Sequence, residues 1–591
     1  MDLPAMGAAS ATGYHRGVTS IDCTSQLSRT RWVILRKSAA NVARCRRYTQ
    51  AESSSKNDCK MRKFKTPRLY VGTPAANSVA RDGRRRINSK KRTMMFDQIQ
   101  HVFVLMLENR SFDHLLGFSG IFGTDAVTGL TTAIHGLSGK ESNSQDGATA
   151  TVTQPADFAM VVDPGHEFAN VLCQLCGPDA RYTSGGDYPP VDGSGFVASY
   201  AAACAKANQK REVAEILKCY SPNQVTVLKT LAEEFAVCDH WHASMPGPTW
   251  PNRMFVHAAS SAGLDHSPTT AEIALWEAAA GFSFPNGDIF DRITTKGLQR
   301  RLYAGDVFPM VSALKGIQLD DIRQYENFPT DLKGQFPYSY VFIEPSYCLL
   351  NDYRGSTSEH PLADLRLGEG LIKATYEAIR NSPLWTSSVL IIIWDEHGGF
   401  FDHVIPPAAV SPADTTPTAA HNKNGFTFEQ YGPRVPAVVI SPWIPKNVVD
   451  HRLYDHSSIP ATLEKLFGLE PLTERDRSAN NVLPLLSLNS ARAHSPSTLP
   501  APAGSGPSEL LSLSPALSSA HSLASPSRPG ESVNEGSLPV VIQAAMRQDL
   551  ALSPPQERAH IIAKVAALKT RSHAAGYLTG VSAKRKAALD H

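Results

Sequence analysis

Long hydrophobic runs are missing from this 591-residue chain, although 42% of its residues are hydrophobic. A membrane-spanning helix needs about 20 consecutive apolar residues, and no run approaches that length. The apolar core of a signal peptide has about 7–15 residues, and Trp32-Val-Ile-Leu35 is too short to supply one. The sequence as written therefore does not support a secretory route, and a cytoplasmic location is the expectation.

The nine cysteines do not form a pattern typical of a disulfide framework. Their number is odd, and they are scattered at positions 23, 45, 59, 173, 176, 204, 219, 238 and 348. Cys173-Gln-Leu-Cys176 has the spacing of a zinc or redox pair, but no second pair of this kind follows. We therefore expect these two cysteines to be ordinary thiols on one face of a helix.

Charge is divided unevenly between the first 93 residues and the rest of the chain. Residues 1–93 hold 21 Lys and Arg against 5 Asp and Glu, whereas the remaining residues hold 37 against 50. A basic leader of this kind can bind nucleic acid or an anionic membrane, or direct a protein to an organelle. Because basic runs arise readily without a specific role, we expect a disordered extension over residues 1–94 and no specific nucleic-acid partner.

Four apolar runs have the length and composition of strands that are buried on both faces of a parallel sheet. They are His101–Leu107, Tyr338–Ile343, Ser388–Trp394 and Val435–Ile440. Between them lie helical patterns, at Val225–Phe235, Asp364–Arg380 and Ser457–Phe467. Alternating strands and helices predict an α/β fold in which helices cover a mostly parallel sheet.

Composition also divides the chain into segments. The predicted sheet lies in a main domain, residues 95–487, within which 128–156 and 265–335 look like insertions that form a cap. Residues 488–535 are rich in Ser, Pro and Ala, which is typical of a disordered linker. The last segment, 536–591, contains two predicted helices, over 538–546 and 555–571.

Two of the predicted strands run directly into acidic turns. Glu108-Asn109 follows the first strand, and Asp395-Glu396 follows the third. Ligands of open α/β sheets bind beyond the carboxyl ends of the strands, so we expect these side chains to meet at one edge. Carboxylates that are packed together repel each other unless a cation or a proton neutralises them. A hard divalent ion bound by oxygen atoms is the simplest solution, although a solvated turn or a helix N-terminus would explain either pair taken alone.

A third segment supplies a candidate nucleophile. In Pro246-Gly-Pro-Thr-Trp-Pro251 the prolines and the glycine hold Thr249 on a rigid turn, ahead of a helix that begins near Asn252 and Arg253. A hydroxyl at such a position can be deprotonated next to a metal ion and attack phosphorus, and Arg253 would offer two donors to phosphate oxygens. The simpler alternative is that Thr249 only caps the helix.

Histidines recur in polar turns near these segments, at positions 166, 360, 397 and 403. A single histidine is usually structural. Several in turns bounded by glycine or proline suggest instead that they protonate a leaving group or stabilise charge.

Five motifs in this order resemble those of the phosphoesterase family, over roughly residues 98–480. They are Glu108-Asn-Arg-Ser-Phe-Asp-His114, Asp163-Pro-Gly-His166, Pro248-Thr-Trp-Pro-Asn-Arg253, Ser358-Glu-His-Pro361 and Trp394-Asp-Glu-His-Gly-Gly-Phe-Phe-Asp-His-Val404. That family includes bacterial phosphatidylcholine-type phospholipases C, plant non-specific phospholipases C and a bacterial acid phosphatase, and many of its members are exported.

The resemblance implies an alkaline-phosphatase-like α/β fold, a hydroxyl nucleophile and one divalent metal ion, Ca²⁺, Mg²⁺ or another. By that similarity Thr249 would attack phosphorus. The residues that would hold the metal are Glu108, Asn109, Thr249, Asp395 and Glu396. The residues that would bind phosphoryl oxygens or assist the leaving group are His166, His360 and His403.

Together these observations predict an enzyme that hydrolyses phospholipid head groups in the manner of a phospholipase C, which implies transient contact with a membrane surface. A broad-specificity acid phosphatase, acting on small phosphate esters at the same site, is the alternative enzyme. A hypothesis of another class is a catalytically silent protein that binds membranes or partners through its basic leader and C-terminal helices.

Overall fold

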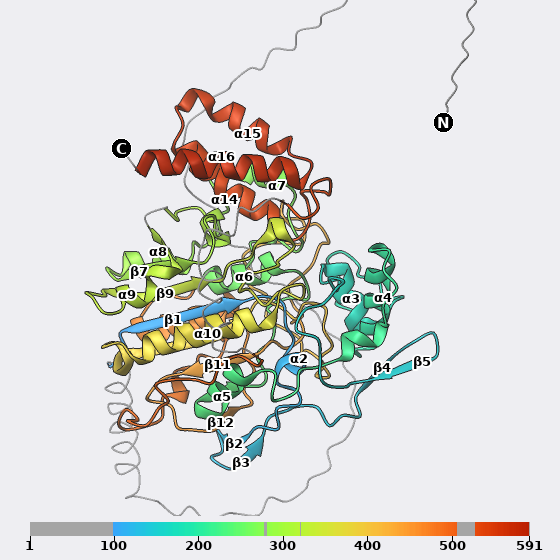
Figure 1. Cartoon of the computed structure of the whole chain (residues 1–591), viewed down its shortest axis with the longest axis vertical. Helices are drawn as coiled ribbons and strands as arrows, with labels where there is room; N and C mark the ends of the chain where they lie inside the picture. The colour runs from blue at the N-terminus through green and yellow to red at the C-terminus, as the bar shows by residue number, and fades with distance from the viewer. Residues whose placement is uncertain (1–97, 277–279, 319–320, 505–525, 590–591) are drawn as a thin grey trace, which may run out of the picture. The chain divides into compact units, whose positions relative to one another are not determined.

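The computed structural model describes residues 98–276, 280–318, 321–504 and 526–589 (Figure 1). The predicted disordered leader, residues 1–94, lies outside the described residues. Within the described ranges, a ten-stranded sheet forms the centre of the structure. Its strand order is β3 (Thr131–Ala133), β2 (Phe122–Asp125), β12 (Val448–Asp450), β6 (Ala236–Cys238), β11 (Ala437–Ile440), β10 (Ser388–Trp394), β1 (His101–Leu107), β9 (Tyr338–Glu344), β7 (Gln299–Ala304) and β8 (Ile322–Gln324).

The central strands consist of apolar residues, and β1 and β10 are buried along their full length. β1 pairs in parallel with β10 on one side and with β9 on the other. Aliphatic side chains suit such positions because they pack on both faces of the pleat and leave water, at about 25 cal/mol per Å². The four predicted strands are confirmed. β11 begins only after Pro436, because proline has no N–H to donate to a neighbouring strand.

The sheet is mostly parallel, as predicted, with local exceptions. β11 runs antiparallel to both β10 and β6, and β3 runs antiparallel to β2. Because β11 is antiparallel to both of its neighbours, β6 runs in the same direction as β10. β12 and β2 are parallel to β6 and share that direction. The carboxyl ends of β1, β10, β6, β12 and β2 therefore lie on one edge of the sheet.

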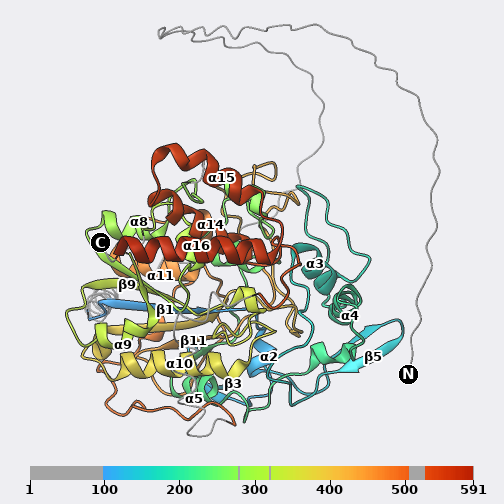
Figure 2. The same cartoon turned by 45° about the horizontal axis from the view of Figure 1, so that its top comes forward.

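Helices flank the sheet in two groups. One group is α5 (Thr226–Glu234), α9 (Phe328–Asp331) and α10 (Leu365–Arg380), and the other is α6 (Thr249–Ala258), α8 (Ile289–Thr295) and α11 (Ser458–Phe467). In both views α5 and α10 lie below β1, and α8 lies above it (Figures 1 and 2). The three helices predicted from the sequence, α5, α10 and α11, are confirmed.

α10 illustrates why these segments are helical. Its buried apolar residues, among them Leu365, Ile372, Tyr376 and Ile379, recur at intervals of three, four and seven and form one face toward the core. The helix begins after Asp364, whose carboxylate accepts a hydrogen bond from the N–H of Arg366. An acidic side chain at this position satisfies a helix N–H that would otherwise lack a partner.

The two expected insertions have different structures. Residues 128–156 contain β3 and a separate two-stranded hairpin, β4 (Ser142–Gln145) with β5 (Ala148–Thr151). Residues 265–335 contain α7 (Thr270–Leu275), α8 and α9, and they also add β7 and β8 to the main sheet beside β9. The second insertion therefore extends the sheet as well as contributing helices around it.

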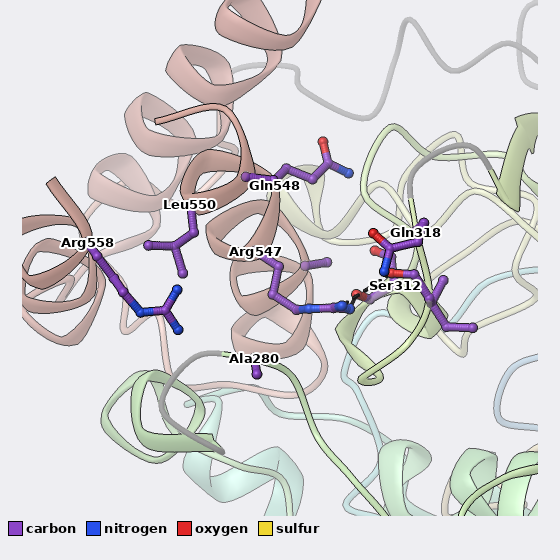
Figure 3. Close-up of a pocket in the computed structure, with 10 residues that line it drawn as sticks. Ala280, Ser312, Gln318, Arg547, Gln548, Leu550 and Arg558 are labelled. Carbon is purple, nitrogen blue, oxygen red and sulfur yellow. Dashed lines mark hydrogen bonds between the residues drawn. The ribbon is translucent and has the colours of Figure 1, made fainter. Parts of the chain in front are cut away.

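The C-terminal segment forms three helices, α14 (Leu538–Ala551), α15 (Arg558–Ala566) and α16 (Arg571–Leu589), where the sequence predicted two. The missed helix, α16, has little apolar periodicity. Arg547 attaches α14 to the main domain by donating to the carbonyl oxygens of Ser312 and Leu314, at the wall of a cavity of about 240 Å³ (Figure 3). None of the helices in the described ranges is both long enough and apolar enough to cross a bilayer.

Part of the segment that was expected to be a linker is bound along α10. Tyr376 donates its hydroxyl to the carbonyl oxygen of Pro496 at 2.6 Å, and Lys373 donates to that of Leu499 at 2.7 Å. Leu499 is buried. Residues 495–501 are thus held against the main domain, because side chains of α10 supply the partners that this irregular backbone needs.

Candidate active site

The turns that follow β1 and β10 lie side by side at the carboxyl edge of the sheet. Leu107 and Trp394 are register partners, so the next residues, Glu108 and Asp395, leave the two strands at the same level. The turns stay in contact, because the N–H of Asn109 donates to Asp395 Oδ1 at 3.0 Å. The structure thus brings together acidic turns that are 286 residues apart in the sequence.

Asn109 connects three segments of the site. Its amide Nδ2 donates to Thr249 Oγ1 at 3.0 Å and to Asp395 Oδ1 at 3.3 Å. The same nitrogen also donates to Glu396 Oε1. The backbone of Asn109 is left-handed, with a φ of 58°, a conformation that asparagine tolerates better than most residues.

Gly398 allows the turn after β10 to approach Asn109 closely. A Cβ atom at Gly398 would lie 2.2 Å from the carbonyl oxygen of Asn109, and the φ of Gly398 is +66°. Both the space and the backbone conformation therefore require glycine at this position.

Thr249 is the first residue of α6, and the turn before the helix holds it in place. Pro248 occupies the N-cap position, which excludes the alternative that Thr249 serves only as a helix cap. Asn252 fixes the turn, because its Oδ1 accepts from the N–H of Met245 at 3.0 Å and its Nδ2 donates to the carbonyl oxygen of Gly247 at 3.0 Å. The Thr249 side chain is therefore well positioned and almost fully buried.

Arg253 lies one turn further along α6 and is fully buried. Its Nε donates to Asp395 Oδ2 at 3.0 Å, and its Nη2 donates to the carbonyl oxygens of Met106 and Leu107 at 3.3 and 3.2 Å. Its Nη1 has no hydrogen-bond partner. The expected contact with phosphate oxygens is thus left to Nη1 alone, and the principal role of Arg253 in this structure is to orient Asp395.

Three oxygen atoms at the centre of the site are buried without a hydrogen-bond partner. They are both carboxylate oxygens of Glu108 and Oδ1 of Asn109. Burial, together with the neighbouring Asp395 carboxylate, raises the pKa of Glu108 well above its usual range. Unpaired buried oxygens next to further carboxylates are the donor set that a hard divalent ion prefers. Glu108, Asn109, Asp395 and Glu396 therefore fit such an ion.

His166 and His360 lie together at the same site with Asp163. The ligand atoms of these three residues are within 4.8 Å of one another, so this group too could hold a metal ion. Burial lowers the pKa of His166, but the carboxylates of Glu396 and Asp163 outweigh it and raise the pKa to about 9. Burial, reinforced by the charge of His166, lowers the pKa of His360 well below its usual range. The two histidines thus favour opposite protonation states.

Comparisons with known proteins show the family of this chain. A family model described as the phosphoesterase family matches residues 99–470. The chain belongs to the phosphoesterase family. It is 35% identical to "Non-specific phospholipase C6" of Arabidopsis thaliana over 425 residues, covering 68% of this chain and 75% of that protein. It is 26% identical to "Phospholipase C B" of Mycobacterium tuberculosis over 404 residues, covering 63% of this chain and 74% of that protein.

Among solved structures, a protein in the alkaline phosphatase superfamily from Vibrio parahaemolyticus is similar to this phosphoesterase. The match covers 46% of this chain and 64% of that chain at 13% identity, with a TM-score of 0.27.

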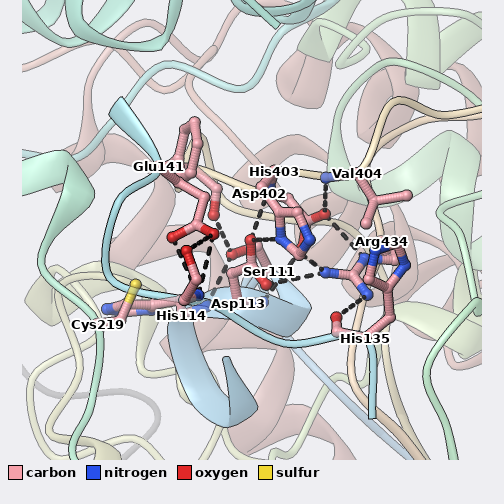
Figure 4. Close-up of polar contacts among 12 residues, drawn as sticks. Ser111, Asp113, His114, His135, Glu141, Cys219, Asp402, His403, Val404 and Arg434 are labelled. Atoms are coloured by element: carbon pink, nitrogen blue, oxygen red, sulfur yellow. Dashed lines mark hydrogen bonds and ion pairs between the residues drawn. The ribbon is translucent and has the colours of Figure 1, made fainter. Parts of the chain in front are cut away.

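In this phosphoesterase His403 belongs to a different network from Thr249 (Figure 4). Its Nδ1 lies 2.7 Å from Asp113 Oδ2, and Arg434 donates to Asp113 Oδ1 at 2.8 Å and to Asp402 Oδ1 at 2.9 Å. In the described parts of the chain, no hydrogen bond or ion pair joins His403 to Asn109, Thr249 or Asp395. The paired charges of this buried network orient the turn that follows β10.

Two residues that orient members of the site were not among those predicted from the sequence. His456 Nε2 lies 2.6 Å from the carbonyl oxygen of Asp395, and Trp241 Nε1 donates to His456 Nδ1 at 3.2 Å. Gln174 Oε1 lies 2.7 Å from Nε2 of His397, the neighbour of Glu396. Gln174 lies inside helix α3 (Phe168–Cys176), and His456 follows Asp455 in a turn without glycine, so only the packing of the fold reveals their positions.

Proposed function

We propose that this protein hydrolyses phospholipids in the manner of a phospholipase C. Its relatives in Arabidopsis thaliana and Mycobacterium tuberculosis carry that activity in their names, and this chain spans about three quarters of their length. Because phospholipids are insoluble in water, hydrolysis would require transient contact of the protein with a membrane surface.

The observation that carries the proposal is the position of the Thr249 hydroxyl. It lies 3.0 Å from the amide nitrogen of Asn109, which also binds the carboxylates of Asp395 and Glu396. The unpaired oxygens of Glu108 and Asn109 belong to the same group. A divalent ion held by Glu108, Asn109, Asp395 and Glu396 would lower the pKa of the hydroxyl and neutralise charge on the phosphoryl oxygens.

The residues of the chain account for the bonds that form and break. Thr249 Oγ forms a bond to phosphorus, the bond from phosphorus to the glycerol oxygen breaks, and that oxygen leaves with a proton. Water then attacks the phosphothreonine, the Oγ–P bond breaks, and Thr249 regains its proton. His166 and His360 are the candidates for exchanging these protons, because both lie with Asp163 near Glu396.

The nucleophile is tested with Thr249→Ala, and the surface threonine variant Thr418→Ala serves as the control. Without the hydroxyl no phosphothreonine can form, so Thr249→Ala is expected to lower hydrolysis of phosphatidylcholine by roughly a thousandfold or more. Thermal unfolding should be close to that of the wild type. Retention of even a tenth of the wild-type rate in Thr249→Ala would exclude Thr249 as the nucleophile.

The substrate class is tested on the wild type, with phosphatidylcholine against p-nitrophenyl phosphate. Four apolar residues were candidates for lipid contact at the mouth of the site. Phe400 and Phe401 are buried and Ile405 is 45% exposed. Trp443 is not a candidate, because it follows β11 and donates to the carbonyl oxygen of Thr386 at the opposite end of β10. A faster rate on the aryl phosphate would favour the acid phosphatase. Purified protein with neither activity nor stoichiometric metal would favour the silent binding protein.

A further inference from the structure

The C-terminal segment, residues 526–589, lies outside the 99–470 family match, yet it contacts a turn beside the candidate active site. This turn comprises residues 348–353 and lies between β9 and His360. Three of its residues have left-handed backbones although none is glycine, namely Cys348 (φ 50°), Asp352 (φ 50°) and Tyr353 (φ 61°). Each such residue costs on the order of 1 kcal/mol or more and persists only where neighbouring contacts impose it.

Asp352 is the point at which the C-terminal segment holds this turn. Arg528 binds both of its carboxylate oxygens, with Nη2 at 2.7 Å from Oδ1 and Nε at 2.9 Å from Oδ2. Arg571, at the start of α16, lies 3.0 Å from the same Oδ1. Burial raises the pKa of Asp352, but its contacts with Arg528 and Arg571 outweigh burial and lower it. The planar guanidinium of Arg528 fixes the direction of the carboxylate as well as its charge.

The main chain of the turn is attached to the same segment. Arg571 Nη1 donates to the carbonyl oxygen of Leu349 at 2.8 Å, and the N–H of Ser527 donates to that of Leu350 at 3.0 Å. The turn is therefore held at both its beginning and its end by residues 527–571.

Tyr353 transmits this geometry to the site. Its ring stacks on the imidazole of His360, with the centroids 3.3 Å apart and the planes at 1°. His360 Nε2 in turn lies 3.7 Å from Asp163 Oδ1. A ring packed face to face limits the rotation of its neighbour, so the orientation of His360 depends on where the turn places Tyr353.

We propose that Arg528 and Arg571 are positioning residues, which bind Asp352 and so place Tyr353 against the His360 ring in the orientation that the reaction uses. This inference rests on the proposed function, in which His360 takes part in proton transfer. It also implies that the family-matched domain alone is incomplete, because residues 526–571 supply part of the support for its active site.

The test uses the full chain with Arg528→Ala, Arg528→Lys and a matched control, Arg323→Ala. Arg323 is 44% exposed and pairs with Asp331 at 2.7 Å, whereas Arg528 is 46% exposed and pairs with Asp352 at 2.7 Å. Each substitution therefore removes a half-exposed arginine from an ion pair with an aspartate, and Arg528 additionally pairs with Glu531 at 2.8 Å. The readouts are kcat and KM on p-nitrophenyl phosphorylcholine, urea unfolding, and hydrogen–deuterium exchange of residues 348–360.

Arg528→Ala is expected to lower kcat about tenfold with little change in KM, because His360 is misplaced while substrate binding is retained. Arg528→Lys should recover only part of the loss, since an ammonium group cannot bind both oxygens in the same plane. Unfolding midpoints should match that of Arg323→Ala. If Asp352→Asn is combined with Arg528→Ala, the two losses should not add. A kcat equal to that of Arg323→Ala, or losses that multiply, would overturn the inference.

Hydrogen–deuterium exchange tests the attachment of the turn independently of the proposed function. Arg528→Ala should accelerate exchange within residues 348–360 severalfold relative to Arg323→Ala, whether or not the substrate is the right one. If the wild type hydrolyses no phosphate ester but exchange accelerates, the proposed function fails and the attachment of the turn stands. If the exchange rate of residues 348–360 is the same in Arg528→Ala as in Arg323→Ala, Arg528 does not hold the turn and the inference is overturned.

Discussion

At the scale of single residues, Asn109 combines three properties that other side chains do not share. It accepts a left-handed backbone, its amide nitrogen donates to Thr249, Asp395 and Glu396, and its amide oxygen is left without a partner. Aspartate has the same shape but no donor, and serine is too short to reach all three oxygens. The amide therefore lets one residue bind a hydroxyl and two carboxylates while its Oδ1 stays available to the proposed cation.

Asn109→Asp tests that role without a change of shape. The variant loses the donor to Thr249 and places a fourth carboxylate among Glu108, Asp395 and Glu396. We expect kcat/KM to fall by roughly a hundredfold or more, in line with the loss of one preorganised donor. Steady-state kinetics on phosphatidylcholine measure the effect.

Asn208→Asp is the matched control for that substitution, because Asn208 is exposed and also left-handed, with a φ of 52°. It should retain wild-type activity. Equal activity of the two variants would show that the amide of Asn109 is not needed.

At the scale of elements, turns rather than strands create the site. β1 and β10 set the level at which the chain leaves the sheet, but the turn after β10 must also bend back toward Asn109. Gly398 makes that bend, since its φ is +66° and a Cβ would lie 2.2 Å from the Asn109 carbonyl oxygen. The direction of one short turn therefore decides whether Glu396 faces Thr249.

Gly398→Ala is expected to abolish most activity and to destabilise the fold, because the methyl group displaces Asn109 as well as straining the backbone. Gly129→Ala is the control, since Gly129 also has a positive φ, +71°, but has nothing within 4 Å of the added Cβ. That control should lose only about 1–2 kcal/mol of unfolding free energy and keep its rate. Activity assays and urea unfolding of both variants separate the effect of the steric clash with Asn109 from the effect of backbone strain. A Gly398→Ala variant with wild-type activity would contradict the close approach of Gly398 to Asn109.

At the scale of the whole molecule, the site joins parts of the chain that are far apart in sequence. Its residues come from the ends of β1 and β10, the start of α6 and the segments around His166 and His360. Buried carboxylates that repel one another oppose folding unless a cation balances them. Binding of the proposed ion would thus add to the stability of the domain.

Removal of divalent ions with a chelator is expected to lower the melting temperature by several degrees and to stop hydrolysis. The reason is that Glu108, Asp395 and Glu396 then have only Arg253 and His166 to balance their charge. Scanning calorimetry with and without added Ca²⁺, Mg²⁺, Mn²⁺ or Zn²⁺ measures the shift and ranks the ions. In Glu108→Gln the chelator should have a smaller effect on melting, since one of the repelling charges is gone. An unchanged melting temperature and rate in the chelated wild type would argue against the ion.

Several features could be predicted from the sequence because they depend on neighbours along the chain. The apolar runs His101–Leu107 and Ser388–Trp394 fill strands that are buried on both faces, and the structure has them with the same bounds. The acids that follow them were expected to meet if the two strands are parallel neighbours, and the structure pairs β1 with β10 in parallel. α16 and the attachment of residues 495–501 have no such local pattern, which is why two helices and a loose linker were expected there.

The sequence by itself determined the four central strands, the family and the list of residue types needed for phosphoryl chemistry. Only the tertiary structure decided which of those residues act together. It groups His166 and His360 with Asp163 near Glu396, it pairs His403 with Asp113 and Arg434, and it turns Arg253 toward Asp395. The physical reason is that a motif records spacing along the chain, whereas hydrogen bonds and charge pairs act through space, where packing of distant segments sets every distance.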